Sequence, residues 1–373
     1  MPQPLVYYIS GHGFGHASRS IEVINAVMTA APAWPIHIRT AAPQWLFDLT
    51  VRGPFVFEAV DTDPGVVQHD SLTLDAEETI RRADRYVREL PALAAREAAY
   101  LTSVDAAFVM ADIPPLGLEA AELAGVPAMA IGNFTWDWIF RDYPGGAAAA
   151  DALGEVYRRG RRAFRLPLCG GFETVPEVID LPFIARRARH SPADTRARLG
   201  LPDGRLALVS FGGYGVSGID LDALSRTEGW TLVVSASVPF GPDGTPLADA
   251  DARGALHPLD EPAMYAVGLR YEDVVAAVDV VVTKPGYGII SECVANDTAL
   301  LYTDRGHFIE YDVLVREMPR YLRCGYLPQP AALAGHWQTA LDQLVQTAPP
   351  AERPPVDGAE VAARWLLDRL ARD

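Results

Sequence analysis

The chain has 373 residues, of which 49% are hydrophobic and 21% charged, a composition typical of a folded globular protein rather than a disordered one. This length exceeds what one hydrophobic core usually supports, so we expect two domains with a cleft between them. The formal charge of −16 would repel duplex nucleic acid and anionic membrane surfaces, so we expect no nucleic-acid partner and a small, locally bound anionic ligand.

Targeting and redox signals are weak in this sequence. The first strand pattern follows Met1 closely, without a basic segment and an apolar run, and no stretch approaches the ~18 apolar residues of a membrane span. The three cysteines, Cys169, Cys293 and Cys324, have no spacing typical of zinc sites or disulfide frameworks. We therefore expect a cytoplasmic protein without a transmembrane segment, and the oligomeric state stays open.

Strand and helix patterns alternate in the first part of the chain, which indicates a parallel sheet covered by helices. Strands are predicted at residues 5–9, 36–40, 106–110 and 128–132, and helices at 20–29, 76–103 and 116–123. Glycine, proline and arginine then become frequent in residues 143–198, and this density of helix breakers predicts the passage between two domains.

A second alternation follows that passage. Strands are predicted at residues 206–211, 231–235, 280–283 and 299–302, and helices at 271–278, 288–295, 310–317 and 361–370. The sequence thus predicts an α/β protein with two Rossmann-like, doubly wound domains facing a cleft. We place the first domain at 1–165, the second domain at 166–350, and a C-terminal helix that packs back on the first domain at 351–373.

The loop GHGFGH, residues 11–16, joins the first predicted strand to a helix. Such a loop presents free backbone N–H groups at the positive end of a helix, so Gly13 and Gly15 are predicted to contact an anionic ligand. Its GxGxG spacing differs from the GxGxxG of redox dinucleotide sites. A tight turn alone is the simpler interpretation, but it would not need His12 and His16, which we take as candidate catalytic residues.

A second strand–turn–helix segment, TKPGYGIISE, spans residues 283–292. Backbone N–H groups from Gly286 to Ile289 would face a diphosphate, and Glu292 could accept hydrogen bonds from ribose hydroxyls, although it could also serve only the helix dipole. The segment DRGHFIEYD, residues 304–312, follows the next strand. His307 and Glu310 are therefore predicted at the same cleft, where they would hold sugar hydroxyls, unless this is a solvated loop.

Three shorter signals complete the predicted cleft. FGGYG at 211–215 is another strand-to-glycine turn, which adds Gly212 and Gly213 to the nucleotide-sugar site. NFTWDW at 133–138 combines aromatic and polar groups, as carbohydrate sites do, although a packed aromatic core would look the same. The acceptor-binding candidates are Asn133, Trp136 and Asp137. Asp112 ends the third strand region and is a further candidate base.

The blocks YYISGHGFGHASRSIEVI, ADIPPLGLEAAELAGVPAMAIGNFTWDWIF and TKPGYGIISECVA resemble glycosyltransferases of the B-type fold, and most closely the glycosyltransferase-like N-terminal module of L-arabinokinases and its free-standing bacterial relatives. The resemblance implies a nucleoside-diphosphate sugar in the second domain, with its diphosphate near Gly286, Tyr287 and Gly288. It also implies that Glu292 lies near the ribose, Glu310 near the sugar ring, and His16 at the diphosphate or the acceptor. Kinase activity is not carried over, because the ATP loop of the kinase domain is absent from this sequence.

These expectations combine into a metal-independent hexosyl- or pentosyltransferase that uses a nucleoside-diphosphate sugar, UDP-linked by preference, and a small-molecule or glycan acceptor. No cofactor or metal is expected. Lys284 or Arg305 would assist the departing diphosphate, and His16 or His12 would act as the base, with Asp112 behind them. Two alternatives remain open at this stage: a nucleotide-sugar 2-epimerase on the same scaffold, and a non-catalytic module that binds a sugar nucleotide.

Overall fold

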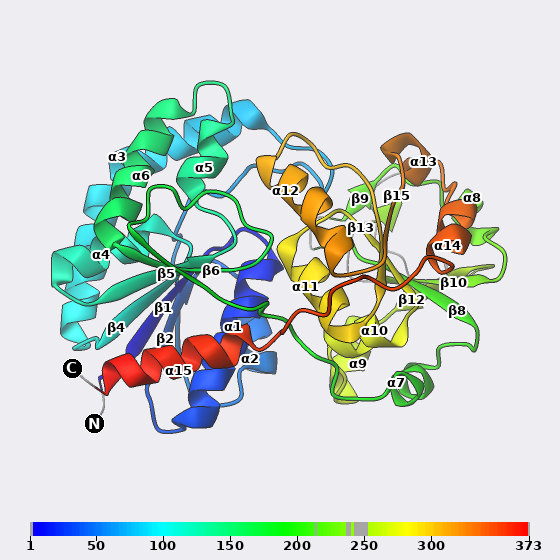
Figure 1. Cartoon of the computed structure of the whole chain (residues 1–373), viewed down its shortest axis with the longest axis horizontal. Coiled ribbons are helices and arrows are strands. Elements are labelled where there is room, and N and C mark those ends of the chain that lie inside the picture. Colours follow the sequence, from blue (N-terminus) through cyan, green and yellow to red (C-terminus); the bar gives the residue numbers. More distant parts are fainter. Residues whose placement is uncertain (1–2, 213–214, 236–239, 242–252, 372–373) are drawn as a thin grey trace.

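A computed structural model describes residues 3–212, 215–235, 240–241 and 253–371 of the protein. It contains two separate parallel sheets, each with helices on its faces, which lie side by side along the long axis of the molecule (Figure 1). Within the described ranges, no helix is both long enough and apolar enough to cross a membrane.

The first sheet has the order β3-β2-β1-β4-β5-β6-β7, and all its strands are parallel. Its strands are β1 (Leu5–Ile9), β2 (Ile36–Thr40), β3 (Val56–Ala59), β4 (Phe108–Asp112), β5 (Ala128–Gly132), β6 (Arg162–Arg165) and β7 (Glu177–Asp180). The strands β1 and β4 are fully buried because helices cover both faces, which explains why they consist of nearly continuous apolar residues.

Six helices accompany these strands: α1 (Phe14–Ala30), α2 (Gln44–Thr50), α3 (Ala76–Ser103), α4 (Pro115–Ala124), α5 (Trp136–Arg141) and α6 (Ala147–Gly160). The C-terminal helix α15 (Gly358–Leu370) returns to the first domain and packs on α1 (Figure 1). There the Trp365 ring meets Phe108 and Phe164 edge to face, at centroid distances of 6.3 and 5.2 Å.

The second sheet has the order β12-β10-β8-β13-β14-β15 and is also parallel. Its strands are β8 (Arg205–Val209), β10 (Trp230–Ser235), β12 (Leu256–Leu259), β13 (Val280–Thr283), β14 (Ala299–Tyr302) and β15 (Cys324–Tyr326), while β9 (Val216–Ser217) and β11 (Phe240–Gly241) form a separate pair. The helices are α7 (Pro192–Leu199), α8 (Leu221–Ser225), α9 (Glu261–Ala266), α10 (Tyr271–Ala277), α11 (Tyr287–Asn296), α12 (Ile309–Glu317), α13 (Gln329–Leu333), α14 (Gln338–Leu344) and a 3-10 turn at Met318–Arg320.

The strand order brings the glycine-rich loops of both domains to the cleft. In the first sheet the order reverses between β1 and β4, and in the second sheet between β8 and β13. Ligands of open parallel sheets bind beyond the carboxyl ends of strands at such a reversal, where neighbouring loops diverge. The residues directly after these strands are Ser10, Ile113, Ser210 and Lys284, so three glycine-rich loops and the end of β4 meet at one place.

The expected passage between the domains is wrong over much of its length. Helix α6 and strands β6 and β7 all fall within residues 143–198, yet they belong to the first domain, whose sheet extends past residue 165 to Asp180. The prolines that suggested a linker include Pro167 and Pro176, which lie in the connection between β6 and β7. The prolines and glycines therefore occur both in a loop within the first domain and in the segment that connects the two domains.

Each domain also contributes apolar side chains to the hydrophobic core of the other. Leu72, from the loop before α3, is 5% exposed and packs among residues of the second sheet, while Phe308, from the loop after β14, packs in the core of the first domain. The two loops are joined because the Gly306 N–H donates to the Leu72 carbonyl at 2.8 Å. The domains are thus interlocked on the side of the cleft where these loops lie.

Candidate functional site

A cavity of about 280 Å³ lies between the two domains and is lined by the loops after β1, β8, β13 and β14. Helices α1 and α11 begin at this cavity, and their first turns approach each other closely. A Cβ on Gly288 would lie 3.2 Å from the Gly15 Cα, which is tighter than most Cβ contacts, so glycine at 288 favours this close approach of the two backbones. Two positive helix ends therefore converge on one space, which favours an anionic ligand.

The first wall of the cavity carries a closed polar network around Asp112. Its carboxylate accepts hydrogen bonds from Arg19 Nε and Nη2 at 2.8 and 2.6 Å and from Ser20 Oγ at 2.7 Å. His16 Nδ1 lies 2.9 Å from Asp112 Oδ1. All four residues are less than 9% exposed, so this network is built into the protein interior.

This network determines the roles of its two titratable members. Burial alone would raise the pKa of Asp112, but the charge and hydrogen bonds of Arg19, with those of His16, outweigh it and lower the pKa to about 2. Asp112 is therefore a permanent carboxylate, poorly suited to the role of base that the sequence suggested. His16 Nδ1 is 2.9 Å from both Asp112 Oδ1 and Arg19 Nη2; because the ionised Asp112 can only accept, we assign a proton to Nδ1, so that Nε2 is unprotonated.

His12 has a different environment, although it lies in the same loop and also lines the cavity. Its Nδ1 accepts a 3.4 Å hydrogen bond from the Val66 N–H, and its Nε2 is 3.3 Å from the Gln68 side-chain amide. Burial, together with the nearby His16, Arg305 and Lys284, lowers the pKa of His12 well below 6.5. Since both ring nitrogens have neighbours within the first domain, His12 is less available than His16 for proton transfer.

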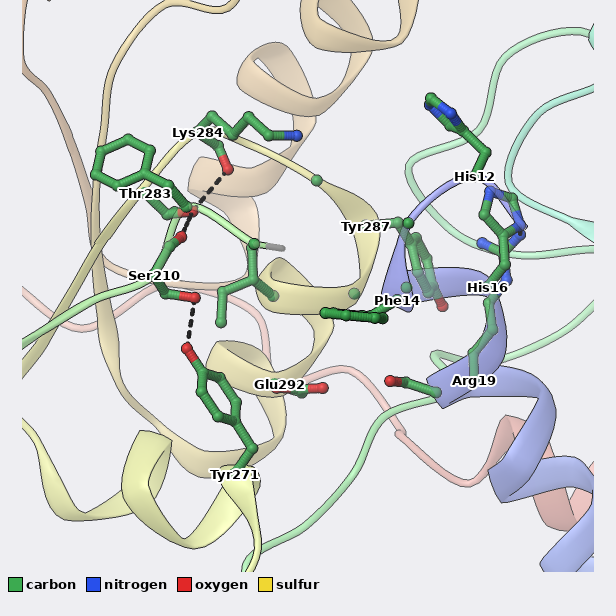
Figure 2. A pocket seen from close by; sticks show the side chains of 18 of the residues that line it. His12, Phe14, His16, Arg19, Ser210, Tyr271, Thr283, Lys284, Tyr287 and Glu292 are labelled. Carbon is green, nitrogen blue, oxygen red and sulfur yellow. Dashed lines mark hydrogen bonds between the residues drawn. The ribbon is translucent and has the colours of Figure 1, made fainter. Parts of the chain in front are cut away.

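The second wall is formed by the start of α11 and by Lys284, which is the only lysine among the 373 residues. Figure 2 shows its side chain extending into the pocket opposite His12 and His16. No hydrogen bond or ion pair involves its ammonium group within the part of the chain that the structure describes. Burial and the charge of Arg305 lower the pKa of Lys284 to about 7, although Glu310 opposes this shift.

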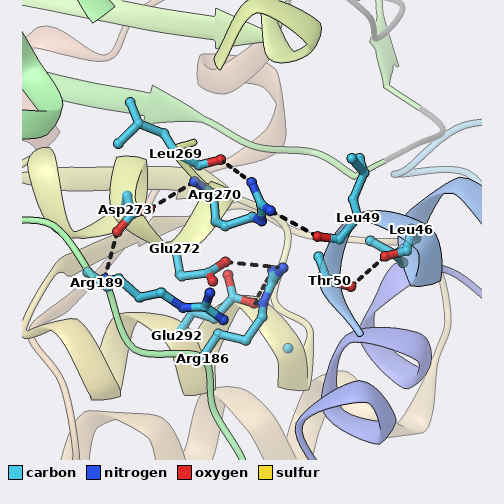
Figure 3. A network of polar contacts seen from close by, with 12 residues as sticks. Leu46, Leu49, Thr50, Arg186, Arg189, Leu269, Arg270, Glu272, Asp273 and Glu292 are labelled. Atoms are coloured by element: carbon cyan, nitrogen blue, oxygen red, sulfur yellow. Dashed lines mark hydrogen bonds and ion pairs between the residues drawn. The ribbon is translucent and has the colours of Figure 1, made fainter. Parts of the chain in front are cut away.

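Glu292 lies one turn into α11 and lines the cavity, as its place in TKPGYGIISE suggested. Its Oε1 accepts a 2.8 Å hydrogen bond from Arg186 Nε, and Arg186 also contacts Glu272 at 3.4 Å (Figure 3). Burial raises the pKa of Glu292, and the positive charge of Arg186 opposes the rise. Two carboxylates share one guanidinium here, so Glu292 retains acceptor capacity toward the cavity.

Glu310 and Asn133 connect the two walls. Asn133 Nδ2 donates to Glu310 Oε1 at 2.7 Å, while its own Oδ1 accepts from Arg19 Nη1 at 2.6 Å. Both residues are at most 6% exposed and both line the cavity. A continuous chain of polar contacts thus runs from the Asp112 network of the first domain to the start of α12 in the second.

Most of the residues proposed from the sequence line this cavity: His12, Gly13, Gly15, His16, Asn133, Gly212, Lys284, Gly286, Tyr287, Gly288, Glu292 and Glu310. Asp112 lies directly behind His16. Gly213 falls outside the described residues, so the structure does not place it.

Three of the proposed residues point elsewhere. Trp136 is completely buried, stacks on Phe140 at 5.4 Å and belongs to the core beneath His12, because its large ring fills the space under the loop. Asp137 accepts a hydrogen bond from Thr174 at 2.9 Å and faces α6. His307 is largely exposed and pairs with Asp142 at 2.7 Å. Their predicted contacts with acceptor or nucleotide sugar are therefore not supported by their positions.

Sequence reasoning did not identify three charged residues at or near the cavity. Arg19 orients both Asp112 and Asn133, and Arg186 holds Glu292. Asp63 accepts a hydrogen bond from Trp136 Nε1 at 3.1 Å, and its burial raises its pKa to about 6. For Arg19 a signal existed, because it lies one helical turn after His16 on α1 and so faces the same side.

Metal-binding clusters were also searched for. Among residues 3–212, 215–235, 240–241 and 253–371, no group of three or more His, Cys, Asp or Glu side chains is arranged to hold a metal ion.

The chain is similar in sequence to the L-arabinokinase of Arabidopsis thaliana, with 29% identity over 377 aligned positions. The similarity covers 97% of this chain but only 34% of that protein, so the chain spans about a third of the length of its curated relative. No protein-family model matches the chain.

Solved structures with the same architecture are glycosyltransferases. The glycosyltransferase of kitacinnamycin aligns over 99% of both chains with a TM-score of 0.64 and 15% identity. A UDP-glucosyltransferase from Polygonum tinctorium, solved with 3,4-dichloroaniline, aligns over 100% of both chains with a TM-score of 0.61 and 14% identity. The chain has the B-type glycosyltransferase fold. At these identities the likeness establishes the fold, as the two tandem sheets predicted, and the chemistry must be argued from the site.

Proposed function

We propose that this protein is a metal- and cofactor-independent glycosyltransferase that moves a hexosyl or pentosyl group from a nucleoside-diphosphate sugar to a hydroxyl of a small molecule or glycan. The observation that carries the proposal is the placement of His16, backed by Asp112, across one cavity from Lys284 and the start of α11. One wall offers a base, and the opposite wall offers positive charge to a leaving diphosphate (Figure 2).

The proposed reaction uses these groups in one displacement. The acceptor oxygen attacks the anomeric carbon, its proton passes to His16 Nε2, and the bond from the anomeric carbon to the diphosphate oxygen breaks. The imidazolium that forms is stabilised by the permanently charged Asp112. Negative charge grows on the diphosphate, where the N–H groups at the start of α11 and the Lys284 ammonium are available to stabilise it.

The donor is proposed to be UDP-linked. Support comes from neighbours of the same fold that are described as UDP-dependent, including the Polygonum tinctorium enzyme and a Phytolacca americana protein solved with UDP-2-fluoro-glucose. Glu292 lies on the cavity wall one turn beyond the start of α11, where its carboxylate would accept hydrogen bonds from ribose hydroxyls. Glu310 would contact the transferred sugar.

The test is a donor and acceptor screen with the purified protein. UDP-, GDP- and dTDP-sugars are incubated with a panel of hydroxylated acceptors, and mass spectrometry follows the glycosylated product and the released nucleoside diphosphate. We expect release of UDP that depends on the acceptor. Binding of UDP-sugars without turnover of any acceptor would instead indicate a binding module, and interconversion of the donor sugar at C2 would indicate an epimerase.

A further inference from the structure

Arg305, in the loop after β14, is a buried cation with few partners. Its side chain is 4% exposed and lines the cavity, yet its Nε has no hydrogen-bond partner among the described residues. Nη1 makes only a long 3.5 Å hydrogen bond to the Pro285 carbonyl and lies 3.8 Å from Glu310 Oε2. Burying a guanidinium with so little compensation is unfavourable, so the unliganded site favours the arrival of an anion.

Arg305 lies between the start of α11, where its Nη1 contacts the Pro285 carbonyl, and the wall of the first domain. Its guanidinium lies over the Phe308 ring, 4.2 Å from the centroid, and that ring packs in the core of the first domain. Phe308 is also 6.4 Å from the His12 ring, and Arg305 is close enough to His12 and Tyr143 to influence their pKa values. The guanidinium of this second-wall residue therefore also faces the first domain, which forms the acceptor side of the cavity.

Neighbouring groups define the chemistry of the missing partner. Glu310 Oε1 accepts a hydrogen bond from Asn133, and the two lone pairs of its second oxygen can accept hydroxyls from both the transferred sugar and the acceptor. Arg305 offers planar N–H donors that match a carboxylate or a phosphate. A ligand that satisfies both groups carries hydroxyls and one negative charge. Sugar phosphates and uronic acids have this combination.

We propose that Arg305 binds an anionic group, a phosphate or a carboxylate, on the acceptor, so that the acceptor is a phosphorylated or acidic sugar. Assigning the anion to the acceptor rests on the proposed function. The presence of an anion site rests only on Arg305 and its surroundings. Lys284 and the start of α11 then serve the diphosphate of the donor, and Arg305 serves a second, separate anion.

The experiment measures binding to the UDP complex by calorimetry. Glucose, glucose 6-phosphate and glucuronate are compared in the wild type, Arg305→Gln, Arg305→Lys and Arg316→Gln. Arg316 is an exposed arginine on the adjacent α12, so its variant is the control for a lost positive charge. Each sugar is also titrated without UDP, so that a failure of UDP to bind would refute the proposed donor and leave the anion site open to test.

We expect one or both anionic sugars to bind the wild type about tenfold or more tightly than glucose, as a charged hydrogen-bonded pair allows. Arg305→Gln should abolish this preference, Arg305→Lys should retain part of it, and Arg316→Gln should behave as wild type. A preference for glucose 6-phosphate identifies phosphate as the group, and a preference for glucuronate identifies carboxylate.

Three results would overturn the proposal. The first is equal binding of neutral and anionic sugars, or no binding of either anionic sugar at about 1 mM, the upper end of ordinary KM values. The second is a loss of UDP affinity of about tenfold in Arg305→Gln, which would assign Arg305 to the diphosphate. The third is a preference for UDP-glucuronate over UDP-glucose that Arg305→Gln removes, which would place the anion on the donor sugar.

Discussion

The two walls of the cavity have the same construction but opposite electrostatic states. Each consists of a parallel strand, a glycine-rich loop and a helix that begins at the cavity, β1 with α1 in one domain and β13 with α11 in the other. On the first wall the buried cation Arg19 is fully engaged by Asp112 and Asn133. On the second wall Lys284 has no partner among the described residues, and Arg305 has only weak ones.

This difference shows which wall is complete without a ligand. A network whose charges neutralise one another holds its side chains in one geometry, as a base that must point at a reacting hydroxyl requires. Cations that are buried without partners are unfavourable until an anion arrives, so they contribute binding energy to a ligand. We infer that the first wall positions a catalytic group and the second wall binds charge.

The largest expected effect comes from breaking the closed network. Asp112→Asn removes the carboxylate that pairs with the buried Arg19, so we expect the free energy of unfolding to fall by about 3 to 5 kcal/mol. Lys284→Met, which removes an unpaired cation from the other wall, should cost no stability. Chemical denaturation of both variants measures the contrast.

The pH dependence of stability should follow from the same carboxylate. Because folding lowers the pKa of Asp112 to about 2, its stabilising contribution is complete above its unfolded pKa of about 4 and is lost as the pH falls from there through about 2. The difference in unfolding free energy between wild type and Asp112→Asn should shrink across this range. A loss of stability in Lys284→Met equal to that of Asp112→Asn would contradict the distinction between the two walls.

The second prediction concerns His16. His16→Ala should lower kcat by about 10²- to 10⁴-fold, the usual contribution of a general base, while the dissociation constant of the UDP-sugar changes little. Stopped-time product assays and calorimetry measure the two quantities separately. His336→Ala changes an exposed histidine in the second domain and serves as the control. Activity of His16→Ala close to that of the wild type would remove His16 from the chemistry.

The third prediction sharpens the role of Glu292 on the second wall. Glu292→Ala should weaken UDP binding by about 1 to 3 kcal/mol, because hydrogen bonds from ribose hydroxyls to a carboxylate are lost. Glu272→Ala is the matched control, since Glu272 also pairs with Arg186 but does not line the cavity. Equal losses in the two variants would mean that Glu292 acts only by holding Arg186.

The smallest expected effect is a pH slope caused by Lys284. Its pKa of about 7 in the free protein means that it is largely neutral in mildly alkaline solution, so the affinity for UDP-glucose should fall by up to about tenfold per pH unit above that value. Lys284→Arg, which stays charged, should bind with no such slope. Arg305, Glu310 and His12, the ionisable groups facing Lys284, are unchanged in this variant.

The unique lysine makes this titration directly observable. Reductive methylation with isotope-labelled formaldehyde adds one side-chain signal besides that of the terminal amine, and NMR can follow its titration. A titration midpoint near the ordinary lysine pKa, or an equal pH slope of affinity in Lys284→Arg, would contradict the prediction. The amine would then be solvated rather than a buried cation that lacks a partner.

The positions of the central elements could be predicted from the sequence. Strands β1, β2, β5, β13 and β14 and helix α3 have the predicted bounds, because buried parallel strands are short apolar runs and α3 has a regular amphipathic pattern capped by Asp75. Strands β3 and β7 at the edge of the first sheet were not predicted, since partly exposed edge strands have mixed polarity.

The site could be predicted only as far as the loops that form it. His16, Gly286 and Glu310 line the cavity, as predicted from their positions after the carboxyl ends of parallel strands. Which side chains turn toward the cavity depends on packing between segments far apart in sequence. Trp136 is directed into the core by Phe140 and Asp63, and Asp112 becomes an orienting group only because Arg19 reaches it from α1.

The exchange of Leu72 and Phe308 between the cores has a consequence for protein engineering. Cutting the chain between the sheets would leave a hole in each half and expose the apolar residues that the two domains contribute to one shared cluster, so neither half should be soluble and stable when expressed alone. Thermal unfolding of the whole chain should accordingly be a single cooperative event. Chimeras that graft a donor domain from a related transferase would need to carry both loops, because the domains share a boundary that no single point in the sequence marks.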